Sequence, residues 1–70
     1  MTQVDSLTLD IGAKEAHLQV YDAGHYLQFV AFISGMQPIP FQMGPDGVWV
    51  GDGNEIVIQK LGSLIEWKDN

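Results

Sequence analysis

Turn-forming residues interrupt this sequence about every ten residues, and this spacing limits the chain to short secondary-structure elements. Eight of the 70 residues are glycine, and most of them lie in residues 22–25, 44–47 and 51–54. The longest apolar run covers only residues 29–33, against about 20 residues for a helix that spans a membrane. Short apolar runs between frequent turns predict an all-β fold and argue against alternating strands and helices.

The first two apolar runs have the period of two that is typical of a half-buried strand. Residues 13–21 begin with good helix formers, yet their apolar residues also alternate, so helix and strand compete there and we favour a strand. The alternating residues are Leu7, Leu9 and Ile11 in the first run and Ala16, Leu18 and Val20 in the second. The polar residues 22–25 predict a hairpin connection to the next strand.

The run over residues 26–34 is the most apolar part of the chain, and its β-branched and aromatic residues favour a strand. Apolar residues fall on both of its faces, so both faces need cover, and in a small chain the second cover could come from another subunit. Residues 35–40 predict a loop, because Pro38 and Pro40 disfavour both a helix and a paired central strand.

Two glycine turns organise the following segment. Residues 44–47 have proline at the second turn position and glycine at the fourth, which predicts a hairpin between residues 41–43 and residues 48–50. The second turn, residues 51–54, is expected to lead into another strand, so that the chain continues as a meander.

The C-terminal segment is predicted to be extended. Residues 55–61 form a strand, and Gly62 is either a turn, which gives six strands, or a bulge in one long bent strand over residues 55–68. In both cases Ile65 and Trp67 share a face, which places Trp67 in the core.

These segments predict one small all-β domain over residues 1–70: an antiparallel meander of five or six strands, folded as a compact sandwich or a small barrel. A chain of 70 residues is too short for two packed units, and a core of this size is rarely sufficient alone. The sequence has no cysteine and no Cys/His cluster for a structural zinc. We therefore expect the chain to associate with itself as a homo-oligomer or with a partner.

The charge excludes several functions. Nine carboxylates and three lysines give a net charge of −6, whereas binding to nucleic-acid phosphates or anionic membranes needs several basic residues on one face. Neither partner is expected. The first residues contain no basic segment followed by an apolar one, so no targeting signal is expected, and the absence of cysteine favours a cytoplasmic location.

Two sets of polar residues resemble chemical sites without meeting their requirements. Residues 52–55 alternate oxygen-bearing side chains as calcium loops do, but Glu55 stands where such a loop needs glycine. His17, Asp22 and His25 could supply acid/base groups or metal ligands, but no nucleophile lies beside them. We expect no catalytic residue, no metal and no cofactor, and so not an enzyme.

Aromatic residues and the glycine turns are the candidate contact residues. Val48 and Val50 are expected to point inward, which turns Trp49 outward, where it contacts a partner or is covered by another subunit or by the loop of residues 36–41. The candidate partner- or ligand-binding residues are Trp49, Tyr26, Met36, Phe41, Asp52 and Asn54.

Excess apolar surface without catalytic chemistry favours a binding or inhibitory protein that engages another protein through an oligomeric β surface. One alternative is sequestration of a small ligand, such as a nucleotide or sugar, at a subunit interface, as small phage and bacterial proteins of similar size do. A third and weaker hypothesis is mimicry of nucleic acid by the carboxylates.

Overall fold

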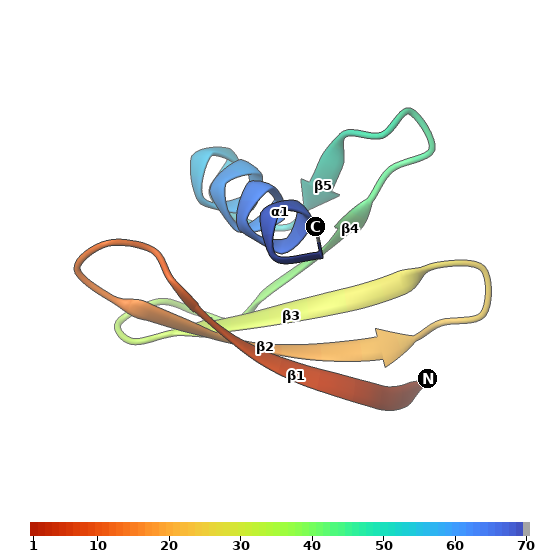
Figure 1. Cartoon of the computed structure of the whole chain (residues 1–70), viewed down its shortest axis with the longest axis horizontal. Coiled ribbons are helices and arrows are strands. Elements are labelled where there is room, and N and C mark those ends of the chain that lie inside the picture. The colour runs from red at the N-terminus through yellow and green to blue at the C-terminus, as the bar shows by residue number, and fades with distance from the viewer. Residues whose placement is uncertain (70) are drawn as a thin grey trace.

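The chain folds into one antiparallel sheet whose strands lie in sequence order, followed by a helix (Figure 1). This computed structural model describes residues 1–69, with side chains through residue 67. The strands are β1 (Thr2–Asp10), β2 (Glu15–Asp22), β3 (Leu27–Ile33), β4 (Ile39–Met43) and β5 (Trp49–Gly51), and the helix is α1 (Glu55–Asp69). The predicted antiparallel meander is confirmed, with five strands, and so is the strand within residues 13–21.

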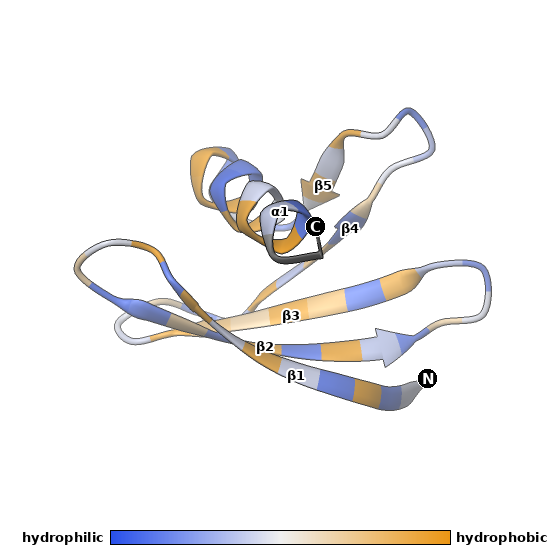
Figure 2. Cartoon of the chain, in the orientation of Figure 1, coloured by the Kyte–Doolittle hydropathy of each residue, from blue (hydrophilic) through white to orange (hydrophobic). Residues whose placement is uncertain are grey.

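Alternating side chains define a core face and an open face of the sheet. β1 and β2 show alternating apolar and polar bands, whereas β3 is apolar along most of its length (Figure 2). Paired residues form rows on the core face: Leu9, Ala16 and Ile33 in one row, and Val20, Phe29 and Phe41 in another. On the open face Phe32 is exposed and Val30 is half-buried, so the second face of β3 has no cover within the described residues.

Aspartates stabilise three of the turns in the same way. The side-chain Oδ1 of each accepts a backbone N–H two residues later: Asp10 from Gly12, Asp22 from Gly24 and Asp46 from Val48, at 2.9, 2.9 and 3.2 Å. Gly24 and Gly47 have φ values of 98° and 84°, a left-handed conformation that favours glycine. The predicted hairpin turns at residues 22–25 and 44–47 are therefore confirmed.

The predicted loop over residues 35–40 is too long at its C-terminal end, because Ile39 and Pro40 belong to β4. β4 begins at Ile39, and Pro40 lies within it, opposite Val30 of β3. Its carbonyl remains in the hydrogen-bond network and accepts the N–H of Asp52 at 3.0 Å. Proline lacks a backbone N–H but keeps its C=O. β4 tolerates Pro40 because it lies beyond the last β4–β5 pair, Phe41 with Gly51, where the ladder needs no further N–H from β4.

The prediction of strands over residues 55–68 is wrong, because this segment is helical from Glu55 onward. Asn54 is its N-cap, with Oδ1 accepting the N–H groups of Ile56 and Val57 at 2.9 and 3.2 Å. The inward residues recur at helical spacing: Val57, Ile58, Leu61, Leu64 and Ile65. Gly62 is therefore neither a turn nor a bulge. Within residues 1–69, α1 is the one helix, and it is not long and apolar enough to cross a membrane.

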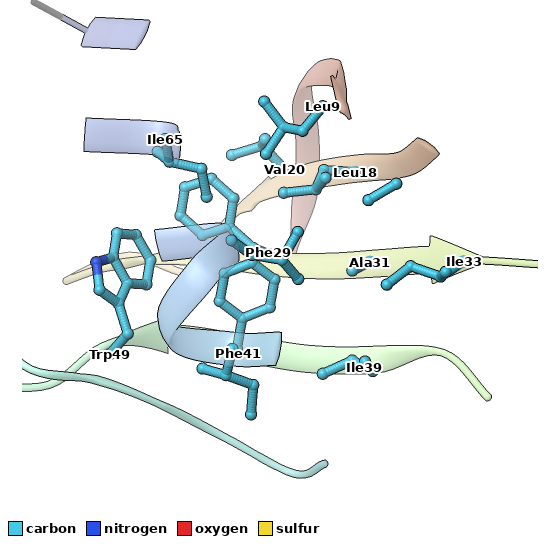
Figure 3. Packing of buried hydrophobic residues seen from close by; sticks show 13 residues of the cluster. Leu9, Leu18, Val20, Phe29, Ala31, Ile33, Ile39, Phe41, Trp49 and Ile65 are labelled. Atoms are coloured by element: carbon cyan, nitrogen blue, oxygen red, sulfur yellow. The ribbon is translucent and has the colours of Figure 1, made fainter. Parts of the chain in front are cut away.

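The core lies between α1 and the core face of the sheet, where the helix packs against β4 and β5 (Figures 1 and 3). Its aromatic part is formed by Phe29, Phe41 and Trp49, whose ring centroids are 5.5 to 5.6 Å apart. The side-chain amide of Gln59 donates to the Trp49 carbonyl at 2.7 Å and so ties α1 to β5. Trp67, predicted to be in the core, is 79% exposed, because a helix turns it away from the face that buries Ile65.

Candidate functional site

An open hollow of about 730 Å³ lies at the end of the sheet where three parts of the chain meet. The turn between β2 and β3, the hairpin between β4 and β5, and the C-terminal half of α1 form its walls. We call this site the apolar hollow; it is lined by His25, Tyr26, Leu27, Phe29, Gln42, Met43, Gly44, Pro45, Trp49, Val50, Ile65 and Glu66. No other described hollow combines this size with a mainly apolar lining.

Several lining side chains remain exposed although they are large and apolar. Tyr26, Leu27, Met43 and Val50 are each between 36% and 48% exposed. Isolated exposed apolar residues are ordinary, but a contiguous group around a concavity is typical of a contact surface. Among the described residues, these four exposed apolar side chains gather around one concavity, while others, such as Ile56 and Trp67, lie outside its lining.

Trp49 forms the floor of the hollow. It was predicted to point outward, but its side chain points into the core. It is only 8% exposed, whereas Val48 and Val50 on either side are 47% and 45% exposed. The strand pattern predicts the opposite orientation, because the element that covers this tryptophan, α1, is a helix and not the predicted strand. The tryptophan faces the helix, and its neighbours face solvent.

Gly62 allows this packing of the tryptophan. A Cβ at position 62 would overlap the pyrrole part of the Trp49 indole, so only glycine lets α1 approach so closely. The indole nitrogen lies on the side of the ring away from Phe29 and Phe41 (Figure 3). It is buried without a hydrogen-bond partner among the described residues. Such an unsatisfied buried donor lowers the free energy of unfolding by about 1–3 kcal/mol.

The structure brings two of the six predicted site residues, Tyr26 and Trp49, into the hollow. Phe41 is fully buried beneath them and supports the floor. Asn54 is the helix cap, and Asp52 is exposed in the turn before it. Met36 is 40% exposed but lies in the β3–β4 turn, at the opposite end of the sheet.

Sequence reasoning missed the other apolar residues of the hollow. Leu27 and Met43 occupy strand ends next to the two predicted hairpin turns, and both line the hollow. Ile65 and Glu66 could be found only by recognising α1, since the helix carries them from the C-terminal segment to the β2–β3 turn.

The histidine set does not assemble. His17 and Asp22 are five residues apart on β2 and therefore on opposite faces of the sheet. His17 lies on the open face, where its Nδ1 is 3.3 Å from the Thr8 hydroxyl, in a second hollow of about 540 Å³ with a more polar lining. Within the described residues no group of three His, Cys, Asp or Glu side chains could hold a metal ion.

The apolar hollow is the candidate functional site, with a floor of packed aromatic rings and a rim of exposed apolar side chains. It offers packing surface and few polar groups. No protein-family model matches the chain, and no curated protein or solved structure is significantly similar to it.

Proposed function

We propose that this chain is a non-catalytic binding protein that engages another protein through the apolar hollow. The observation that supports this proposal is the concentration of exposed apolar side chains around a concavity of about 730 Å³. Protein interfaces derive most of their affinity from a few large side chains that fill such depressions.

The size of the hollow favours a protein segment over a single side chain. A closed cavity of about 150 Å³ is enough for a benzene ring, so the hollow has room for several apolar side chains of a partner. Its floor is held in place by the contacts of Trp49 with Phe29 and Phe41. A floor that is already ordered loses little conformational entropy on binding.

Affinity capture with matched variants tests this proposal. Tagged wild-type protein, Leu27→Asp and Ile56→Asp are each incubated with an extract of the cells that produce the protein, and the bound proteins are identified by mass spectrometry. Leu27 is 48% exposed and lines the hollow, whereas Ile56 is 80% exposed on α1 outside it. We expect Leu27→Asp to lose a partner that Ile56→Asp retains.

Both variants should keep the wild-type circular dichroism spectrum, because neither position is buried. A partner that binds Leu27→Asp as well as the wild type would refute binding through the hollow. Loss of the partner in both variants would assign the interaction to a wider surface.

A second candidate function is capture of a small ligand, because the volume of the hollow falls in the range of about 300–1,000 Å³ that is typical of ligand sites. A thermal-shift screen with nucleotides and sugars at millimolar concentration separates the two functions. A shift that Leu27→Asp abolishes favours the small ligand, and a panel without any shift favours the protein partner.

A further inference from the structure

Carboxylates stand at the rim of the apolar hollow. Asp22 is the direct cross-strand partner of Leu27, so the two side chains share a face of the sheet. Asp46 follows Pro45 in the β4–β5 turn, and Glu66 of α1 lines the hollow itself. Asp22 and Asp46 are both exposed. The hollow therefore combines an apolar floor with an acidic rim.

The lysines whose side chains are described lie at the opposite end of the sheet. Lys14, in the β1–β2 turn, donates to the carbonyl of Ser34 at 2.9 Å. Lys60, near the start of α1, donates to the carbonyl of Ile11 at 3.1 Å. Neither ammonium group can reach the hollow while it makes these contacts. Among the described side chains, therefore, no lysine lies beside the carboxylates near the hollow.

We infer that the partner segment carries large apolar side chains flanked by lysine or arginine. This inference rests on the proposed protein-binding function and names the chemistry of the partner. The apolar side chains occupy the hollow, and the basic residues meet Asp22 and Asp46 at its rim. An acidic segment of the same apolar content is rejected, because like charges at a rim lower the association rate and the affinity.

The rim charges are expected to contribute selectivity more than total affinity. An exposed ion pair is worth about 0.2–1 kcal/mol, and it weakens as salt screens it. Burial of apolar side chains against Trp49 and Leu27 supplies the larger share. Binding should therefore persist at high salt, while its preference for basic segments declines.

Panning of a phage-displayed library of random dodecapeptides tests this chemistry directly. The wild-type protein is the target, and Leu27→Asp is used for counter-selection, so that enriched peptides are those that need the hollow. We expect the enriched sequences to place lysine or arginine next to Trp, Phe, Leu or Met.

A pair of double variants then tests where the charge acts. Asp22→Asn with Asp46→Asn removes two rim charges, while the asparagine Oδ1 can still accept the turn N–H groups of Gly24 and Val48. Asp10→Asn with Asp52→Asn removes the same charge at the far end of the sheet, where Asp10 makes the same kind of turn. We expect the rim pair to bind a synthetic enriched peptide about three- to tenfold more weakly at low salt, and the far pair to match the wild type.

The outcomes separate this inference from the proposed function. Enriched peptides that need Leu27 but lack basic residues, or equal affinity for the two double variants, overturn the basic partner and leave the hollow as a protein-binding site. Failure to enrich any peptide that needs Leu27 overturns both. A wild-type dimer in sedimentation analysis that Leu27→Asp dissociates assigns the hollow to a second copy of the chain and also overturns the basic partner.

Discussion

The sheet from β1 to β4 and the unit formed by β5 and α1 are held together in different ways. β1, β2 and β3 pair along most of their length through short hairpins, and side chains alternate between faces. β4 pairs with β3, and β5 with β4, over three residues each. The β5–α1 unit is fixed by close approaches at Gly51, Gly53 and Gly62, which lie against Phe41, Ile39 and Trp49 respectively.

This difference shows that the two parts tolerate change differently. A strand held by a long ladder can lose one side chain and keep its register, because the remaining pairs still specify it. The helix α1 has no backbone ladder to the sheet and is less redundantly fixed, since it is held by packed side chains, by the hydrogen bond from Gln59 to Trp49 and by the close approach of Gly62 to the indole ring. The apolar hollow lies between the two parts, so its shape depends on the less redundant one.

Replacement of Trp49 by alanine is the most severe test of this contrast. Removing a buried Trp side chain costs about 3–5 kcal/mol, a large share of the 5–15 kcal/mol that is typical of a whole protein. Because an isolated helix of about 15 residues is marginal in water, α1 should lose helicity as well. Urea unfolding followed by circular dichroism measures both effects.

Phe32→Ala is the corresponding change on the open face of the sheet, at a large aromatic residue of β3 that is 39% exposed, against 8% for Trp49. Its loss should lower the free energy of unfolding by less than about 1 kcal/mol. Equal losses in the two variants would contradict the proposed difference between the sheet and the β5–α1 unit.

Gly62→Ala tests the close approach itself and should have an intermediate effect. Alanine is favoured over glycine in a helix by about 1 kcal/mol, but its Cβ overlaps the Trp49 ring, and overpacking of this kind costs about 1–3 kcal/mol. We expect a net destabilisation of about 0–2 kcal/mol in urea unfolding. Ser63→Ala, on the exposed side of the same helix, should be neutral or slightly stabilising, and a stabilised Gly62→Ala would show that the contact with Trp49 is loose.

The sheet could be predicted from the sequence because its signals are local. Alternation at Leu18 and Val20 and the turn at Gly24 each involve residues that are close in sequence, and the structure pairs them as expected. Pro40 was misjudged because the rule against proline in paired strands concerns its missing N–H. In β4 the carbonyl of Pro40 makes the bond that matters.

The helix was missed although its pattern is present. Ile58, Leu61 and Ile65 recur at helical spacing, and Asn54 precedes them as a cap, but β-branched residues and Gly62 lower the helix propensity of the segment. Glycine is needed at position 62 because the helix lies directly against Trp49, thirteen positions earlier. No local sequence pattern reveals this contact. The floor of the hollow was hidden for the same reason, since the orientation of Trp49 follows from the helix above it.

The smallest effects are expected for side chains that only accept backbone N–H groups. Asn54 does so at the start of α1, and Asp10 does so in the β1–β2 turn, so the two parts of the fold can be compared. Asn54→Ala removes the acceptor for two N–H groups at the start of α1 and should lower the free energy of unfolding by about 1 kcal/mol. Asn54→Asp keeps the acceptor and adds a negative charge at the helix N-terminus, so it should be neutral or stabilising. Asp10→Ala removes one acceptor in an exposed hairpin turn, whose N–H can bond water instead, and about 0.5 kcal/mol is expected. A larger loss for Asp10→Ala than for Asn54→Ala would mean that the β1–β2 turn, and not the start of α1, is where this fold depends on a single side chain.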